Sequence, residues 1–331
     1  MINLDKKYKK SLEKIKFIDL FAGIGGFRIA LESFGAKCVF SSEIDSYAIQ
    51  TYKENFNDIP RGDIRQISIS EIPQHEILCA GFPCQPFSIS GKQIGFNDSR
   101  GTLFFEIIKI VEHKRPLVLL LENVNNLTTH NKGKTFSIII ASLQKLKYNV
   151  FYNILNSSNF NVPQSRKRLY IIAINSEKNN YIFNFPKGNM NFKSVQDILE
   201  NNINEKYFID RKDISINYKK TKNSIISEKP VRIGTINKGG QGERIYSISS
   251  VGITLIAEGG GLASKTGAYY VNNRIRKLTP REAARMQGFP DNFKIVVGDS
   301  QAWKQFGNSI TIDVLQHILK ELIDQKIIGK E

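Results

Sequence analysis

Cys84 is the residue whose surroundings most clearly favour chemistry. It lies between Pro83 and Pro86 in the segment GFPCQPFSISGKQIGFNDSRGT, directly after a short apolar run. The two prolines exclude regular helix and a central strand, and open α/β sheets carry their sites at the carboxyl ends of strands. A thiolate in such a loop could attack an electrophilic carbon. Cys38 and Cys79 lie in apparent strands, and we interpret them as inert core residues.

A carboxyl group and two guanidinium groups could assist this nucleophile. Glu122 and Asn123 follow the apolar run 117–121, which should end at the same edge of the sheet. Arg166 and Arg168 alternate in QSRKRLY at the start of a further strand, so both side chains should face one side. The arginines could orient Glu122 or hold phosphate. In the alternative interpretation, Glu122 only caps a turn and the arginines are a solvated charge pair.

The segment FIDLFAGIGGF predicts a nucleoside pocket. A strand leads into a turn with Gly23, Gly25 and Gly26, and Glu43 follows in the next strand-helix connection. Such glycines let a ligand approach the backbone, and a carboxylate after the second strand can bind ribose hydroxyls. The spacing is not GxGxxG, which favours adenosine without diphosphate, as in S-adenosylmethionine, over NAD. Asp63 could accept from the adenine amino group. Alternatively, the glycines only form a tight turn.

An α/β framework is needed to position these groups. From residue 17 to about 175, short apolar runs alternate with segments of helical spacing, which is typical of βα units around a parallel sheet. We therefore expect an α/β fold with a doubly wound, mostly parallel sheet. The expected strands are 17–21, 38–41, 76–80, 117–121 and 168–174, and the expected helices are 27–33, 46–55, 103–113, 135–147 and 311–328.

The second half of the chain has a different character. After Pro186 it becomes polar, with glycine clusters at 238–242 and 259–261 between short alternating runs, which predicts a smaller irregular β-rich domain. The 331 residues include 47 Lys and Arg against 31 Asp and Glu, a formal charge of +16. This excess favours a polyanionic partner such as nucleic acid. Alternatively, the glycine-rich region is a flexible loop set that contacts only DNA backbone.

Several classes of protein are disfavoured by composition. No apolar run approaches the roughly 18 residues that a membrane span needs. The first sixteen residues contain many lysines but no apolar core of a secretory signal. Three irregularly spaced cysteines suit neither a disulfide framework nor a structural zinc site. We expect a cytoplasmic protein without a metal ion, and a monomer.

Six motifs resemble the ordered motif set of the DNA cytosine-C5 methyltransferases. They are FIDLFAGIGGF, GFPCQPFS, ENV, QSRKR, RKLTPREAARMQGFP and QFGNSI, spread over nearly the whole chain. The resemblance implies a Rossmann-like, S-adenosylmethionine-dependent methyltransferase with a target-recognition domain. The implied parts are a catalytic and cofactor-binding domain at 1–196, a target-recognition domain at 197–279, a hinge at 280–303 and a segment at 304–331 that completes the catalytic domain.

The mechanism that the resemblance implies agrees with the residue chemistry. Cys84 would add to C6 of a cytosine flipped out of duplex DNA, which makes C5 nucleophilic toward the methyl group. S-adenosylhomocysteine would be the product. Glu122, partly protonated, would bond to N3 and the 4-amino group, while Arg166 and Arg168 would position the ring and polarise O2. Water would take the C5 proton, since no side chain stands out as its base.

The resemblance also implies contact residues and two departures from the family pattern. Ile44 stands where the family often has an aromatic that stacks on adenine, so we expect a weaker stack. Glu258 stands where a similar member has a tyrosine before three glycines. The implied cofactor contacts are Phe21, Gly23, Ile24, Gly25, Glu43, Ile44, Asp63, Ile64, Pro83, Leu103, Asn308 and Ser309. The implied DNA contacts are Ser88, Ser90, Lys92, Arg100, Gln241, Arg244, Thr254 and Glu258.

The likeness extends further to a member of this family that methylates GCGC. It includes the loop GKQIGFNDSRGTLFF and the string KGGQGERIYS, in which Gln241 and Arg244 would bond guanine edges and fill the vacancy in the duplex. We therefore expect the target GCGC and a type II restriction-modification system, with a cognate restriction endonuclease that forms no stable complex.

Two other functions remain as alternatives. A cytosine-C5 methyltransferase acting on RNA is disfavoured by the small domain that carries Gln241 and Arg244. A non-catalytic DNA-binding protein is disfavoured by the intact Cys84 and Glu122. A nicotinamide dehydrogenase is disfavoured by the glycine spacing.

Overall fold

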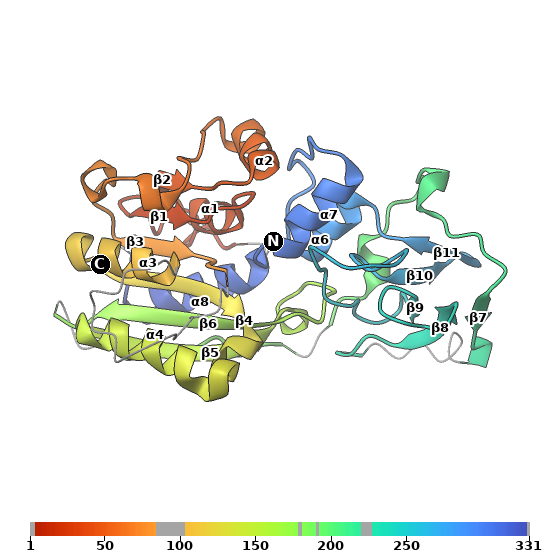
Figure 1. Cartoon of the computed structure of the whole chain (residues 1–331). Helices are drawn as coiled ribbons and strands as arrows, with labels where there is room; N and C mark the ends of the chain where they lie inside the picture. The colour runs from red at the N-terminus through yellow and green to blue at the C-terminus, as the bar shows by residue number, and fades with distance from the viewer. Residues whose placement is uncertain (1–3, 84–102, 178–180, 190–191, 220–226, 330–331) are drawn as a thin grey trace.

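Two β-sheets organise the chain, seen in a computed structural model that describes residues 4–83, 103–177, 181–189, 192–219 and 227–329 (Figure 1). The first sheet has the order β2-β1-β3-β4-β6-β5. Its strands β1 to β4 are parallel, whereas β6 runs antiparallel to both β4 and β5. The strands are β1 Lys16–Leu20, β2 Lys37–Ser42, β3 Ile77–Ala80, β4 Val118–Val124, β5 Tyr148–Asn156 and β6 Lys167–Asn175. The expected α/β class is confirmed, with a mixed sheet.

Helices cover both faces of this sheet because its strands are apolar on both sides. Alternate residues of β1 enter different cores: Phe17 packs with α1 (Gly26–Glu32) and α8 (Ile312–Asp324), and Ile18 packs with α3 (Leu103–Lys114) and α4 (Lys134–Lys145). Helix α2 (Ser46–Phe56) follows β2 and begins where the Asp45 carboxylate accepts hydrogen bonds from the backbone N–H groups of its first turn. This arrangement places the carboxyl ends of β1 to β4 at one edge.

The second sheet has its own apolar core and the order β11-β10-β9-β8-β7. Strands β10 and β11 form a hairpin. Its two turn residues, Asn272 and Asn273, both have positive φ, as a two-residue hairpin turn requires. Figure 1 shows this sheet beside the first one, with α6 and α7 between them. The strands are β7 Ile214–Ile216, β8 Arg232–Ile236, β9 Arg244–Ser247, β10 Ala268–Val271 and β11 Arg274–Lys277.

After the second sheet, the chain returns to the first. Helix α6 (Pro280–Met286) begins with a capping box in which the Thr279 and Glu282 side chains bond to each other's backbone N–H groups. Helix α7 (Asp299–Asn308) follows, so the expected boundary between 303 and 304 falls inside a helix. Helix α8 then packs on α1, where Gln316 Nε2 donates to Ser33 Oγ at 2.9 Å. The short 3₁₀ helices are η1 Ile64–Gln66, η2 Ile69–Glu71, η3 Asn125–Thr128, η4 His130–Gly133, η5 Ser157–Asn159, η6 Val195–Ile198 and η7 Glu205–Tyr207.

Two features of the first sheet differ from the sequence prediction. Strand β4 continues to Val124, so Glu122 and Asn123 lie within the strand instead of following it. Their backbone groups pair with β6, which explains the continuation. Strand β5 was not predicted at all. In the part of the chain that the structure describes, no helix has the length and apolarity needed to cross a membrane.

Candidate active site

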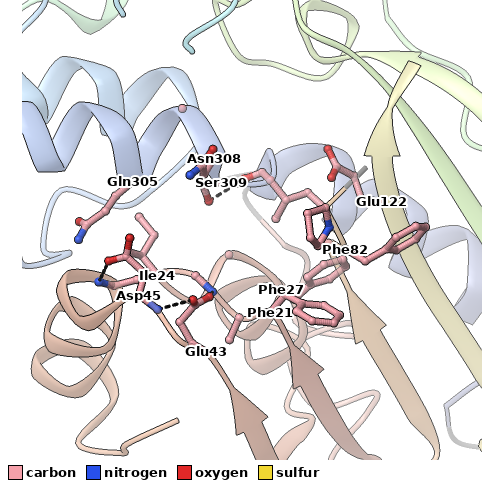
Figure 2. Close-up of a pocket in the computed structure, with 18 of the residues that line it drawn as sticks. Phe21, Ile24, Phe27, Glu43, Asp45, Phe82, Glu122, Gln305, Asn308 and Ser309 are labelled. Carbon is pink, nitrogen blue, oxygen red and sulfur yellow. Dashed lines mark hydrogen bonds between the residues drawn. The ribbon is translucent and has the colours of Figure 1, made fainter. Parts of the chain in front are cut away.

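A cavity of about 410 Å³ opens at the carboxyl edge of β1 to β4 (Figure 2). Its wall combines the Gly-rich turn after β1, the turn after β2, the ends of β3 and β4, the start of β6 and the end of α7. Most of the predicted site residues that the structure describes meet here. These lining residues are Phe21, Gly23, Ile24, Glu43, Ile44, Pro83, Leu103, Glu122, Arg166, Arg168, Asn308 and Ser309.

The Gly-rich turn gives this cavity a floor of exposed backbone. Phe21, Gly23 and Gly25 all have positive φ, at 58°, 54° and 85°. A Cβ added at Gly23 would meet no atom within 4 Å, so that side of the turn is open. A Cβ at Gly25 would lie 2.3 Å from the ring of Phe56, so only glycine fits there. The turn therefore lets a ligand reach the backbone.

Glu43 is held beside this turn by three backbone donors. Its Oε2 accepts from Gly23 N at 2.8 Å, and its Oε1 accepts from Ile44 N at 2.7 Å and Asp45 N at 2.8 Å. A carboxylate has about four acceptor sites, so Glu43 keeps capacity for a ligand hydroxyl. The neighbouring Ile44 side chain is 69% exposed and lines the cavity as an apolar surface.

Helix α7 closes the cavity through contacts that the sequence analysis missed. Lys304 Nζ lies 3.1 Å from Asp45 Oδ2, and Gln305 Nε2 donates to Tyr47 O at 2.9 Å. Thr51 Oγ1 donates to Gln305 Oε1 at 3.2 Å. Asp45, Lys304 and Gln305 all line the cavity. The motif QFGNSI contained the signal, since Gln305 precedes Asn308 by one helical turn.

Three predicted cofactor residues do not line the cavity. Gly25 belongs to the same turn, but the space beside its Cα is filled by the rings of Phe56 and Tyr52. The Asp63 carboxylate forms an ion pair with Arg65, which lowers the pKa of Asp63, and also accepts from the backbone N–H of Arg65. Ile64 is buried in the core beneath α3. The Asp63 carboxylate is therefore satisfied within its own turn.

Glu122 and Arg168 form the polar end of the cavity. Arg168 Nε lies 3.3 Å from Glu122 Oε1, and the two side chains are 16% and 13% exposed. Burial raises the pKa of Glu122, against the opposing effect of Arg168 and Arg166. The carboxyl group can thus hold a proton at higher pH than an ordinary glutamate.

Arg166 lines the same cavity, and its guanidinium group bonds to the backbone. Its terminal nitrogens donate to three carbonyls: Nη1 to Leu255 O at 3.0 Å, and Nη2 to Gly307 O at 3.1 Å and Ser309 O at 2.9 Å. Burial and the neighbouring Arg168 lower its pKa to about 10. These bonds join the start of β6 to the end of α7 and to the second half of the chain. The predicted contact of Arg166 with the target base stays a prediction.

Asn123 fixes the start of the loop that carries Cys84. Its Nδ2 donates to Phe82 O at 2.8 Å, and its Oδ1 accepts from Val124 N at 2.8 Å. Pro83 lines the cavity and is the last described residue before Cys84. Five predicted residues of this loop lie outside the described residues: Cys84, Ser88, Ser90, Lys92 and Arg100.

The other predicted DNA contacts lie on two glycine-rich loops and the segment before one of them. Gln241 is exposed on the loop before β9, and Arg244 is the exposed first residue of that strand. Glu258 is exposed before Gly259. Thr254 Oγ1 donates to Ser165 O at 2.6 Å, so its hydroxyl joins the second half of the chain to the first. In the described ranges, no cluster of three or more His, Cys, Asp or Glu side chains is arranged to hold a metal ion.

Comparison with known proteins identifies the class of enzyme. The family model of the C-5 cytosine-specific DNA methylases matches residues 15–324. The chain therefore belongs to this family of DNA methyltransferases, which confirms the resemblance seen in the motifs.

The relatives span nearly the whole chain. It is 49% identical over 310 residues to the type II methyltransferase M.HhaI of Haemophilus parahaemolyticus, covering 93% of this chain and 94% of the relative. It is 42% identical over 312 residues to M.DsaV of Dactylococcopsis salina, covering 94% and 86%. The structure of a mutant DNMT2 from Spodoptera frugiperda is similar, with a TM-score of 0.70 and 21% identity over 93% of this chain and 99% of that one. The last likeness shows a shared fold.

Proposed function

We propose that this enzyme methylates C5 of a cytosine flipped out of duplex DNA, with S-adenosylmethionine as methyl donor. The observation that carries the proposal is the meeting of two half-sites in one cavity. A Gly-rich turn with the carboxylate of Glu43 lies at one end, and a buried carboxyl group, Glu122, lies at the other, beside the start of the Cys84 loop. One end suits a nucleoside and the other suits a base with a ring nitrogen and an amino group.

The residues present fit S-adenosylmethionine. Glu43 would accept from the ribose hydroxyls, Ile44 would pack on the adenine, and the open side of Gly23 would admit the rest of the molecule. Asn308 and Ser309 would close the pocket from α7. The cofactor supplies an electrophilic methyl group. Asp63 and Ile64 would shape the turn behind the adenine, because neither residue lines the cavity.

Ile44→Trp is expected to tighten S-adenosylmethionine binding by about 2- to 10-fold, because aromatic stacking adds about 0.5–1.5 kcal/mol beyond area burial. Ile44 is 69% exposed, so a larger side chain meets no core there. Isothermal titration calorimetry without DNA would measure the change. Tyr47→Trp, on an exposed neighbour that does not line the cavity, is the matched control and should leave affinity unchanged. Equal or weaker binding by Ile44→Trp would remove Ile44 from the adenine site.

The protein groups would act at four atoms of the cytosine. The Cys84 thiolate would add to C6, and the electron pair displaced would make C5 nucleophilic. Glu122, protonated, would donate to N3 and accept from the 4-amino group as charge develops. Arg168 would hold Glu122 and reach O2, with Arg166 fixing the backbone around both. After methylation, loss of the C5 proton to water and expulsion of the thiolate would restore the aromatic ring and the free enzyme.

The second sheet would belong to the target-recognition domain, residues 197–279. Residues 304–331 would complete the catalytic domain formed by residues 1–196. Gln241 and Arg244 would bond guanine edges in the major groove. Thr254, Glu258, Ser88, Ser90, Lys92 and Arg100 would make further contacts to the DNA. The expected target is GCGC, and the expected setting is a type II restriction-modification system in the bacterial cytoplasm. The enzyme would act as a monomer beside a separate endonuclease.

Bisulfite sequencing of DNA from a host that expresses the gene tests this function. Protected cytosines are expected within GCGC sites. Incubation of the purified enzyme with labelled S-adenosylmethionine should transfer the methyl group to duplex DNA and not to transfer RNA. Transfer to RNA alone would support the RNA methyltransferase, and transfer to neither would support a non-catalytic DNA-binding protein.

A further inference from the structure

Residues 255–257 are fixed to the wall of the active-site cavity. Leu255 O accepts from Arg166 Nη1 at 3.0 Å, and Leu255 N donates to Gln164 Oε1 at 2.9 Å. A Cβ at Gly307, which lines the cavity, would lie 2.5 Å from Ala257 N, so the two backbones are in direct contact. The next residue, Glu258, therefore leaves this wall at the rim of the site where the target base is expected to bind.

Glu258 then joins the second glycine-rich loop, which packs on the loop that carries Gln241. Ala263 N donates to Gly242 O at 3.1 Å, and a Cβ at Gly242 would lie 3.0 Å from Gly260 O. Side chains would not fit between these backbones. Glu258 consequently stands between the cavity and the residues expected to bond guanine edges.

Among the residues that the structure describes, the Glu258 carboxylate forms no ion pair with a lysine or arginine side chain. The nearest lysine along the chain, Lys265, is turned to α7, where its Nζ donates to Ser300 O at 3.1 Å and Ser300 Oγ at 2.9 Å. Glu258 is exposed. By contrast, Glu243 on the neighbouring loop accepts from Asn237 Nδ2 and Gly240 N. Glu243 is thus used within the protein, and Glu258 is available to a ligand.

We propose that Glu258 accepts a hydrogen bond from the 4-amino group of a cytosine that stays in the duplex, and so specifies one G·C pair of the target. This proposal rests on the proposed function. A bare carboxylate near phosphates is unfavourable unless it meets a donor, and the major groove offers amino groups on cytosine and adenine. Adenine places the acceptor N7 beside its amino group, which repels the second carboxylate oxygen. Cytosine has a C5–H there, so cytosine suits a carboxylate better.

The test uses duplexes that contain the target sequence found by bisulfite sequencing. Each cytosine that is not methylated is replaced, one at a time, by 2-pyrimidinone, which lacks the 4-amino group. For the natural enzyme, one replacement should lower kcat/KM by roughly 5- to 150-fold, the range expected for one good base contact. For Glu258→Ala, the same replacement should have no further effect. Glu258→Gln should gain activity on a site with adenine at that position, because a carboxamide bonds both N6 and N7.

Two variants separate this role from others. Glu228→Ala removes an exposed carboxylate elsewhere on the second half of the chain and controls for net charge. Arg244→Ala should instead lower discrimination at a guanine and leave the response to 2-pyrimidinone unchanged. If no replacement affects the natural enzyme, or if Glu258→Ala only strengthens binding to all DNA as Glu228→Ala does, the assignment is wrong. Methylation of unmodified target DNA would still stand, so failure here is distinct from failure of the proposed function.

Discussion

Cys84→Ser is expected to lower methylation of a cognate duplex by about 10⁴-fold or more, as removal of an enzyme nucleophile typically does. A serine hydroxyl is hardly ionised at neutral pH, whereas a cysteine thiol in general ionises far more readily and is the stronger nucleophile. Duplex binding should persist, because the residues expected to bond bases and phosphates are unchanged. Methyl transfer and gel-shift assays on the same oligonucleotide would measure both.

A trapped adduct identifies the attacking sulfur directly. DNA with 5-fluorocytosine at the target should remain covalently attached to Cys84, because fluorine cannot leave C5 as a cation. Cys79→Ser is the matched control: Cys79 is fully buried and burial raises the pKa of its thiol well above the usual value. Its variant should trap DNA as the natural enzyme does. Peptide mapping that places the adduct elsewhere, or full activity of Cys84→Ser, would contradict the proposed mechanism.

Glu122→Gln is expected to lower kcat by about 10²- to 10³-fold, the usual loss when a group that stabilises developing charge is removed. A carboxamide can bond the cytosine edge but cannot supply a proton to N3. Because burial raises the pKa of Glu122, the protonated form persists above the usual range, and activity of the natural enzyme should fall as pH rises through that pKa. The variant should lose this limb of the pH profile. Single-turnover kinetics across pH would show it.

The same substitution should stabilise the protein without ligands. A carboxyl pKa that is higher in the folded state favours folding most at low pH, and this contribution is lost as pH rises through the folded pKa. At neutral pH the buried charge of Glu122 therefore lowers the free energy of unfolding, and Glu122→Gln should raise Tm. The gain should disappear below the ordinary glutamate pKa of about 4.3. Glu112→Gln, at an exposed position on α3, should change neither property. A lower Tm for Glu122→Gln at neutral pH would mean that the ion pair with Arg168 outweighs burial.

The apolar pattern was sufficient to predict strands β1 to β4 and β6 and helices α1 to α4 and α8, but it did not predict α6 or α7. Strands β1, β3 and β4 are short, mostly buried apolar runs, and β2 is buried over its second half. The predicted bounds of these four strands differ from the observed ones by at most three residues at an end. Strand β5 (YNVFYNILN) was missed because it lies at the sheet edge, is only partly buried and contains three asparagines, which disfavour strands. The antiparallel direction of β6 depends on long-range pairing and leaves no local signal.

The candidate site shows the same division. Gly23, Glu43 and Glu122 were found because each follows or ends an apolar run in a recognisable motif. Arg166 was placed in the cavity correctly, but its carbonyl partners come from segments far along the chain, so its role could not be read locally. Asp63 looked available until the structure placed Arg65 against it. Lys304 and Gln305 were missed because their contacts with the turn after β2 arise only in the folded chain.

The late return of the chain to the first sheet sets an order of events during translation. The Gly-rich turn leaves the ribosome early, yet the wall formed by Lys304 to Ile310 and the helix that covers α1 emerge last. The residues of the second sheet are therefore synthesised before the cavity can be closed. Premature termination before α8 would release a product that lacks the helix packed on α1, and we expect no methylation from it. In a cell that also makes an endonuclease, such fragments would leave the chromosome unprotected.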